Sequence, residues 1–219
     1  MSGALSPSRI IQNQHRELGS MYNQAMPDDF SSIKKQLRRQ CMEKRASLAE
    51  DFRRQASFAI CRHILSWDIF QKAEVIFTYM PMNEEVDLLP LMAGNPGKEW
   101  VIPRIQPHSR MILHPYNPHM LIRHKYGMLE PDPSLPEISP GRVDLVLVPG
   151  LAYDLNGWRL GYGGGFYDTF LSAATHLATL GITYHALLLD DLPHLEHDIP
   201  VRALVTEDGL MELSMEYKD

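Results

Sequence analysis

The run Asp-Leu-Val-Leu-Val at residues 144–148 constrains the fold of this chain more than any other segment. It is short and continuously apolar after its first residue, and Pro149 and Gly150 end it. A strand with one exposed face alternates apolar and polar residues, whereas this pattern is typical of a strand buried on both faces. The run therefore predicts an inner strand of a sheet that is covered on each side.

Helical and strand-like segments alternate along the rest of the chain. Helical patterns cover residues 31–47, 50–65, 88–93 and 166–180, with Gly181 expected to end the last helix. Strand patterns cover residues 74–80, 99–103, 111–116, 182–189 and 203–206. This alternation predicts an α/β fold with three layers (αβα), in which a mostly parallel sheet carries helices on both faces.

The domain organisation follows from the absence of breaks in this pattern. Residues 30–219 contain no internal repeat and no compositional linker, so we expect a single α/β domain there. Residues 1–29 lack periodicity and are rich in Ser, Asn, Gln and Met, which predicts a disordered N-terminal tail. Met21 and Met26 in that tail are candidate translation starts.

Composition points to a soluble protein. Apolar residues make up 44% of the chain, and no apolar run reaches the roughly 18 residues that a membrane span needs. The first 30 residues hold charged side chains and no apolar core of a secretory signal. Cys41 and Cys61 have no metal-binding or redox spacing, so we expect two buried thiols and a cytoplasmic location.

Positive charge gathers in one segment although the net charge is −6. Residues 30–62 hold nine Lys or Arg against three Asp or Glu. Only Phe52 and Phe58 stand among these cations, which is not the interleaved aromatic pattern of a nucleic-acid site, so we expect a solvated helix face or a small anionic ligand rather than nucleic acid. Lys34 and Arg38 lie four residues apart and would point in the same direction from a helix.

The decapeptide 159–168, Arg-Leu-Gly-Tyr-Gly-Gly-Gly-Phe-Tyr-Asp, is the strongest functional signal. Its four glycines remove Cβ atoms, so that backbone N–H groups can approach an oxyanion closely. Arg159 precedes the glycines and Asp168 follows them, between a predicted strand and a predicted helix. This arrangement suits a polyphosphate and its divalent metal.

Three familiar phosphate-binding motifs do not match this segment. The dinucleotide fingerprint requires a glycine where Phe166 stands, and a Walker A loop requires a Lys that is missing here. The further motifs of a protein kinase are missing as well. A glycine-rich turn without a ligand is the alternative, but such a turn has no need of Arg159, Tyr162, Tyr167 and Asp168.

The sequence resembles the 5-formyltetrahydrofolate cyclo-ligase (5,10-methenyltetrahydrofolate synthetase) family over roughly residues 33–210. The most specific match joins Val-Pro-Gly-Leu-Ala-Tyr-Asp at 148–154 to the decapeptide 159–168. Other matching segments follow in the expected order: Lys34-Lys-Gln-Leu-Arg38 with Arg45, Glu85-Val-Asp87, Pro103-Arg104, Tyr126-Gly127, Glu130-Pro131, His197-Asp198 and Val205-Thr206-Glu207.

The resemblance implies an enzyme that converts 5-formyltetrahydrofolate to 5,10-methenyltetrahydrofolate, with ATP as co-substrate and Mg²⁺ as cofactor. It implies ATP binding by Lys34, Arg38, Arg159, Leu160, Gly161, Tyr162, Gly163, Gly164, Gly165, Phe166 and Tyr167. It implies substrate binding by Met80, Glu85 and Tyr167, catalysis by Arg159 and Tyr167, and metal binding by Asp168 and Asp198.

Two other functions remain open at this point. The same ATP site is compatible with another formamide or carboxylate as the phosphoryl acceptor, and a folate-binding protein without catalysis is the third possibility. Leu88 stands where many family members have Thr, next to the expected folate-binding segment. We expect small-molecule substrates, neither nucleic acid nor membrane as a partner, and a monomer or weak homodimer.

Overall fold

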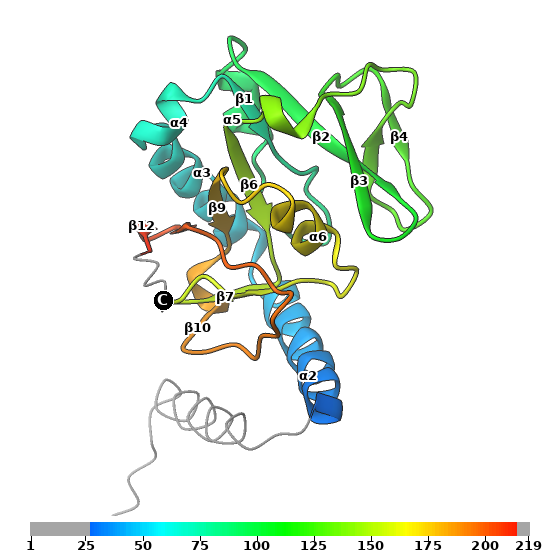
Figure 1. The fold of residues 1–219 in the computed structure, drawn as a ribbon. Coiled ribbons are helices and arrows are strands. Elements are labelled where there is room, and N and C mark those ends of the chain that lie inside the picture. Colours follow the sequence, from blue (N-terminus) through cyan, green and yellow to red (C-terminus); the bar gives the residue numbers. More distant parts are fainter. Residues whose placement is uncertain (1–26, 214–219) are drawn as a thin grey trace, which may run out of the picture.

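A seven-stranded central sheet organises the fold in the computed structural model, which describes residues 27–213 (Figure 1). Its strand order is β12 (Gly209–Glu212), β11 (Ala203–Thr206), β9 (Ala178–Ile182), β6 (Leu145–Pro149), β1 (Val75–Phe77), β2 (Glu99–Gln106) and β3 (Arg110–Pro115). The five strands from β11 to β2 are parallel, and the two edge strands are antiparallel to their neighbours. The predicted mostly parallel sheet is therefore confirmed.

Strand side chains alternate between two apolar layers, one on each face of the sheet. Leu145 and Leu147 of β6 belong to one buried cluster, and Val146 and Val148 belong to the other. All four side chains are fully buried, which explains why β6 reads as a continuous apolar run. The run at 144–148 thus forms a central strand, as its sequence predicts.

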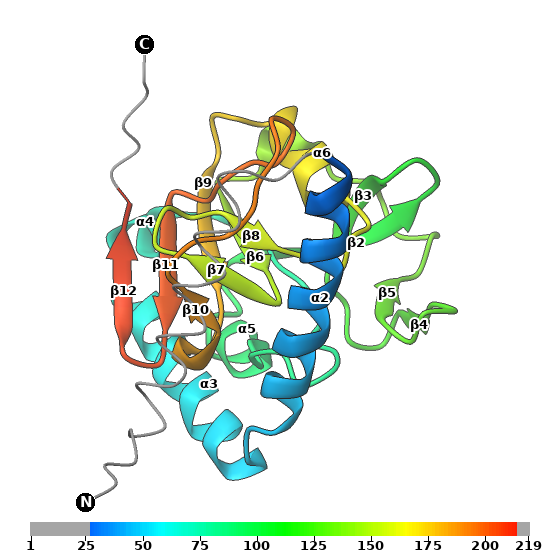
Figure 2. The ribbon, with the colours of Figure 1, turned by 90° about the horizontal axis from the view of Figure 1, so that it is seen from below.

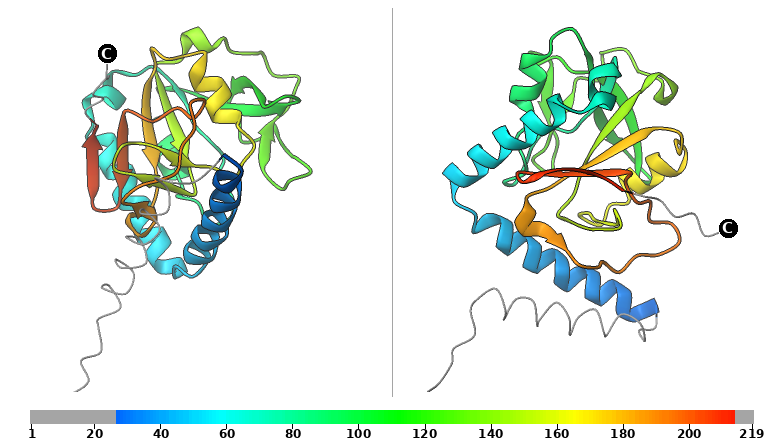
Figure 3. Two further views of the ribbon diagram at one scale, coloured as in Figure 1. Left: turned by 60° about the horizontal axis from the view of Figure 1, so that its bottom comes forward. Right: turned by 90° about the vertical axis from the view of Figure 1, so that its left-hand side faces the viewer.

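Helices cover both faces, and this completes the three predicted layers (Figures 1 and 3). On one face lie α3 (Glu50–Leu65), α4 (Asp68–Lys72) and α5 (Leu89–Gly94). The other face is covered by α6 (Phe166–Ser172). No helix among residues 27–213 is long and apolar enough to cross a membrane.

The long helix α2 (Pro27–Ala46) lies beside a second, three-stranded sheet (Figure 2). That sheet consists of β10 (Leu188–Leu189), β7 (Ala152–Asp154) and β8 (Arg159–Leu160). Leu37 and Cys41 of α2 are buried against the core, as their spacing predicts. The helix begins within the segment expected to be a tail, and the remainder of that segment lies outside the described residues.

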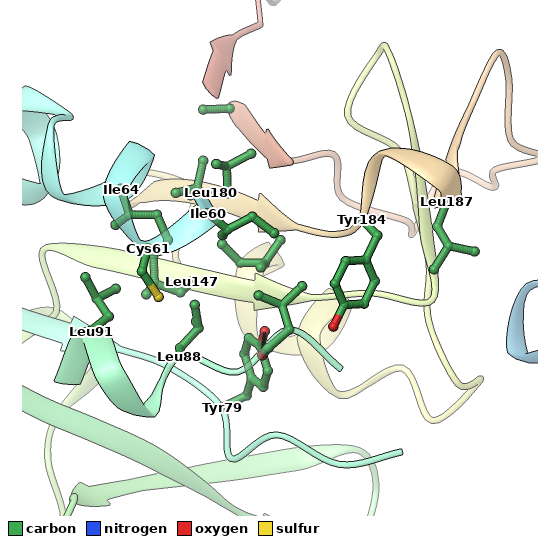
Figure 4. Close-up of a cluster of buried hydrophobic side chains, with 14 of the residues drawn as sticks. Ile60, Cys61, Ile64, Tyr79, Leu88, Leu91, Leu147, Leu180, Tyr184 and Leu187 are labelled. Carbon is green, nitrogen blue, oxygen red and sulfur yellow. Dashed lines mark hydrogen bonds between the residues drawn. The ribbon is translucent and has the colours of Figure 1, made fainter. Parts of the chain in front are cut away.

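Leu88 lies in the apolar core and not at a binding surface. Its side chain is fully buried and is drawn among Cys61, Leu91 and Leu147 (Figure 4). The side chain faces the layer of α3 and α5, and whether Leu88 affects folate binding through its neighbour Glu85 stays a prediction. A Leu at this position fills core volume.

The smaller elements connect these layers. A two-stranded sheet of β4 (Leu121–Arg123) and β5 (Leu129–Pro131) follows the β2–β3 hairpin, and short 3₁₀ turns occupy η1 (Pro140–Arg142) and η2 (His185–Leu187). The hairpin forms one edge of the central sheet and lies on the right of Figure 1.

The predicted helix over residues 166–180 is wrong in its second half. The helix α6 ends at Ser172, and the chain then forms β9, which pairs with β6 and β11. Gly181 therefore lies inside β9 and does not end a helix. Glycine fits this strand position because a Cβ atom there would approach the Tyr153 ring to 2.6 Å. The predicted strand 182–189 is likewise replaced by the end of β9, η2 and β10.

Candidate functional site

One cavity of about 650 Å³ collects the residues singled out in the sequence. It lies beyond the carboxyl ends of β1 and β6, since Tyr79, Met80 and Pro149 line it. In the sheet, β2 lies next to β1 on one side, whereas β9 and β11 follow β6 on the other side. The order in which strands are added therefore changes direction between β1 and β6. Ligand sites of open α/β sheets form at such a change of direction.

Every predicted site residue lines this cavity. They are Lys34, Arg38, Met80, Glu85, Arg159, Leu160, Gly161, Tyr162, Gly163, Gly164, Gly165, Phe166, Tyr167, Asp168 and Asp198. They come from α2, from the segment after β1, from β8, the start of α6 and the loop between them, and from the loop before β11. The fold thus brings together side chains that lie up to 164 positions apart in the sequence.

The glycine loop, residues 161–165, connects the two-residue strand β8 to the seven-residue helix α6. Gly163 and Gly165 have φ angles of +94° and +65°, which side-chain-bearing residues rarely adopt. A Cβ atom at Gly163 would lie 3.4 Å from the Arg38 guanidinium carbon, which is an ordinary contact distance. The positive φ angles, and not a lack of space, therefore favour glycine at these two positions.

Two hydrogen bonds from distant elements hold this loop. Arg38 Nε of α2 donates to the Gly161 carbonyl at 2.8 Å. Ser109 Oγ at the tip of the β2–β3 hairpin donates to the Gly164 carbonyl at 2.7 Å. The loop is therefore fixed from opposite sides of the cavity, and nothing in the sequence pattern around Ser109 indicates this contact.

Two of the three predicted phosphate-binding cations are already paired with carboxylates. Lys34 Nζ lies 2.5 Å from Asp198 Oδ2, and Arg159 Nη2 lies 2.9 Å from Asp168 Oδ1. Burial acts to raise the pKa of Asp198, but hydrogen bonds from Lys34 and the Leu195 N–H outweigh it and lower that pKa. Asp198 and Asp168 thus lie next to the two cations, Lys34 and Arg159, that the sequence analysis expects to bind ATP.

Arg159 and Tyr167 contribute polar atoms that lack partners. Arg159 Nε and the Tyr167 hydroxyl are buried without a hydrogen bond to any of the residues that the structure describes. The arginine lies over the Tyr167 ring at 5.3 Å, and that ring stacks on Phe77. Burial raises the pKa of Tyr167, so its hydroxyl remains protonated and is available as a donor.

Glu85 is held in a different way at another part of the wall. Its Oε2 accepts the Met82 N–H at 3.0 Å, and its Oε1 accepts the Tyr162 hydroxyl at 3.0 Å. The Arg45 guanidinium donates to the same hydroxyl and lies 3.9 Å from Oε1. Burial raises the pKa of Glu85 more than these partners lower it.

Arg45 does not line the cavity, but it contacts two residues that do, Glu85 and Tyr162, and the sequence analysis did not predict this role. It was noted as part of the family pattern, but its contact with Glu85 was not predicted. The signal was available: Arg45 follows Arg38 by seven residues, which is about two turns of one helix face. Arg104 does not line the cavity either; it donates to the Pro131 carbonyl and pairs with Glu130.

Apolar side chains form the rest of the wall. They include Met80, Met82, Pro103, Ile105, Met111, Met128 and Leu129. Methionine adapts its shape and makes favourable contacts with aromatic rings. The cavity therefore combines a cationic, glycine-rich part with an apolar part that contains a buried carboxylate, and it is large enough for an organic ligand.

Asp168 and Asp198 could bind a divalent cation only if a bound ligand supplied further oxygen atoms to it. Asp168 Oδ2 and Asp198 Oδ1 make no hydrogen bond to a described residue. Within residues 27–213, no three His, Cys, Asp or Glu side chains are grouped closely enough to hold a metal by themselves. Mg²⁺ typically binds through one or two carboxylates together with substrate phosphates and water, and this donor set suits that mode.

Comparison with known proteins gives this fold and cavity a family. The family model described as the 5-formyltetrahydrofolate cyclo-ligase family matches residues 30–207. The Escherichia coli K12 protein named 5-formyltetrahydrofolate cyclo-ligase is 27% identical over 178 residues, which cover 78% of this chain and 98% of the relative. The mouse protein of the same name is 25% identical over 194 residues, covering 82% and 96%.

Solved structures agree with this relationship. The NMR structure of Aquifex aeolicus 5,10-methenyltetrahydrofolate synthetase has 33% sequence identity and a TM-score of 0.74, covering 85% of this chain and 97% of that one. The Mycoplasma pneumoniae synthetase has 20% identity and a TM-score of 0.64, and it supports the fold. The chain belongs to the 5-formyltetrahydrofolate cyclo-ligase family, a family of enzymes.

Proposed function

We propose that this protein converts 5-formyltetrahydrofolate to 5,10-methenyltetrahydrofolate in a reaction that consumes ATP and requires Mg²⁺. The observation that carries the proposal is the single cavity in which cations and a glycine loop adjoin an apolar wall with a buried carboxylate. One part has the chemistry of a polyphosphate site, and the other has the chemistry of a site for a flat, polar heterocycle. Membership of the family supports this reading.

The cationic part would bind ATP. Lys34, Arg38 and Arg159 would contact phosphate oxygens, with the loop backbone from Leu160 to Tyr167 around them. The unpartnered Nε of Arg159 supports this assignment, because a phosphate oxygen would satisfy it. Asp168 and Asp198 would hold Mg²⁺, which when bound neutralises the charge that develops on the transferred phosphoryl group.

The apolar part would bind the reduced folate. Glu85 would accept hydrogen bonds from N–H groups of the pterin, and Met80 and Tyr167 would pack against the ring system. Each Glu85 oxygen accepts one hydrogen bond in this structure and has capacity for another. The Tyr167 hydroxyl, buried and protonated, would donate to the substrate at the junction of the two parts.

The proposed chemistry changes a poor leaving group into a good one. The formyl oxygen attacks the γ-phosphorus of ATP, the bond to ADP breaks, and an iminium phosphate forms at N5. N10 then attacks the activated carbon, and phosphate leaves as the ring closes. The protein contributes position and charge stabilisation: Arg159 beside the transferred group, and Glu85 holding the pterin.

The test mixes the protein with ATP, Mg²⁺ and 5-formyltetrahydrofolate and follows the near-ultraviolet absorbance of the methenyl product. We expect product only when all three are present. Folded protein that gives no product would contradict the proposal. ATP consumption with a different formamide or carboxylate would instead assign another acceptor, and tight folate binding without turnover would indicate a binding protein.

The setting of this activity is part of the proposal. We place the protein in the cytoplasm as a monomer or weak homodimer with small-molecule substrates, and with neither nucleic acid nor membrane as a partner. The two cysteines, Cys41 and Cys61, are free thiols in the structure, and burial raises the pKa of each to about 11. Such unreactive thiols are compatible with a reducing compartment.

A further inference from the structure

Two ion pairs face the cavity where the proposed function puts the phosphates of ATP. In each pair a cation assigned to phosphate contacts a carboxylate assigned to the metal: Lys34 with Asp198 and Arg159 with Asp168. The exposed fractions of these side chains are small, 11% and 13% in the first pair and 7% and 20% in the second. The charges therefore neutralise each other inside the site.

These pairs create an obstacle for an anion that arrives alone. A metal-free polyphosphate that bonds to Lys34 or Arg159 comes next to the carboxylate that each cation already holds. It must either displace that carboxylate or lie against it, and both outcomes leave negative charges close together in a partly buried site, which is strongly unfavourable. A nucleotide that carries a divalent cation avoids this cost, because its metal binds the carboxylates while its phosphates bind the Lys and Arg.

We infer that the two ion pairs select the metal complex of the nucleotide over the free nucleotide. Asp168 and Asp198 act as internal competitors for the phosphate-binding cations, and partner exchange releases them when metal and phosphate arrive together. The inference rests on the proposed ATP and Mg²⁺ site. It adds a role for the carboxylates before any metal is bound.

Arg38 shows the contrast within the same cavity. Its Nε donates to the Gly161 carbonyl, and among residues 27–213 no carboxylate forms an ion pair with it. A phosphate can approach its remaining N–H groups without displacing a negative charge. Arg38 is therefore suited to the first contact with either form of the nucleotide, and selection arises at the two paired cations.

The experiment removes one competitor and measures nucleotide binding without turnover. The variant Asp168→Asn keeps the shape of the side chain and removes its charge. Titration calorimetry would measure the affinity of the non-hydrolysable analogue AMP-PNP, once with excess EDTA and once with Mg²⁺. We expect the variant to bind the metal-free analogue about tenfold more tightly than the parent, and the Mg²⁺ complex no more tightly.

The control is Asp190→Asn, which removes the same charge from an exposed residue that does not line the cavity. It corrects for the general gain in anion affinity when net charge becomes less negative. Equal metal-free affinities of Asp168→Asn and Asp190→Asn would overturn the inference. If Asp168→Asn does not fold, Asp198→Asn tests the Lys34 pair in the same way.

The failure of the proposed function has a separate signature. A parent protein that binds the analogue neither with Mg²⁺ nor without it contradicts the nucleotide site itself. A parent that binds the Mg²⁺ complex, with variants that keep the same preference for it, contradicts only the selection by ion pairs.

Discussion

Two carboxylates in one cavity respond to burial in opposite ways. Asp198 contacts Lys34 directly and also accepts the Leu195 N–H, and these bonds outweigh burial and lower its pKa. Glu85 lies 3.9 Å from Arg45 with a tyrosine hydroxyl between them, and burial prevails and raises its pKa. Glu85 is more deeply buried than Asp198, 6% against 13% exposed, and its cation is farther away, 3.9 Å against 2.5 Å. Both differences favour the neutral form of Glu85 relative to that of Asp198.

The ion pairs of this site are of two kinds: pairs that can exchange partners with a ligand, and one pair that is enclosed by the protein. The Asp168 and Asp198 pairs face the cavity and can exchange their partners for a ligand. The pair of Arg45 and Glu85 is 4% and 6% exposed and is bridged by Tyr162, so its charges stay together. We expect substitutions at the first kind of pair to change chemistry and substitutions at the second to change stability and folate binding.

The largest expected effect is at Arg159. Arg159→Met removes the cation that we propose to lie beside the transferred phosphoryl group, and we expect kcat to fall roughly a thousandfold, about 4 kcal/mol in the barrier. Steady-state formation of the methenyl product measures it. Arg142→Met is the control, because Arg142 also pairs with a carboxylate, Glu99, but outside the cavity. A similar kcat for both variants would remove Arg159 from the reaction.

Arg45 tests the enclosed pair. Arg45→Met leaves Glu85 buried without its cation, and we expect the free energy of unfolding to fall by about 3 kcal/mol. Urea denaturation at neutral pH measures it, with the exposed Arg39→Met on the same helix as the control. The double variant Arg45→Met/Glu85→Gln should recover more than half of the loss. No recovery would mean that the two residues do not act as a pair.

A substitution at Leu88 tests whether this residue contributes to the stability of the core or to folate binding. Leu88→Thr puts a smaller, polar side chain into a fully buried position, and we expect a loss of about 2 kcal/mol of unfolding free energy. Folate affinity of the folded protein should stay unchanged. Leu89→Thr, at an exposed neighbour, is the matched control for thermal denaturation. Weaker folate binding by a variant with unchanged stability would show that Leu88 contributes to the folate site and not mainly to the core.

The smallest expected effect is at Tyr162. Tyr162→Phe removes a hydrogen bond that favours the charged form of Glu85, so the pKa of Glu85 rises further. Folate binding through charged Glu85 is lost as pH falls through that pKa, and in the variant the loss should begin at higher pH. At neutral pH we expect about tenfold weaker binding.

Fluorescence titration of 5-formyltetrahydrofolate across a pH series measures the effect at Tyr162. Tyr126→Phe is the control, since Tyr126 lines the cavity without a bond to Glu85. Superimposable pH profiles for Tyr162→Phe and the parent protein would show that the bridging hydroxyl does not govern the charge of Glu85.

Sequence patterns predicted those elements whose structure is determined by their own residues and not by distant contacts. The apolar run at 144–148 predicted β6, the spacing of apolar residues predicted α3 with both ends correct, and residues 203–206 form β11 as expected. The glycine pattern predicted the loop between a strand and a helix. In each case propensity, periodicity and burial favour the same element.

Contacts distant in sequence decided the rest. The segment after Ser172 has no strong helix breaker, yet it becomes β9 because β6 and β11 offer hydrogen bonds on both sides. The contacts of Arg45 with Glu85 and of Ser109 with Gly164 join segments that no local pattern connects. The resemblance identified the residues around the cavity, but the pairing of its cations with its carboxylates required the structure.

The hydrogen bonds around the cavity also have a consequence for folding. The two that hold the glycine loop join residues 55 apart, Ser109 and Gly164, and 123 apart, Arg38 and Gly161, and the bond between Lys34 and Asp198 joins residues 164 apart. Contacts over such separations form only after the intervening chain has collapsed. The loop therefore reaches its binding shape late, once α2, the β2–β3 hairpin and the segment before β11 are all in position, and a chain released before its last strands are made has no functional cavity.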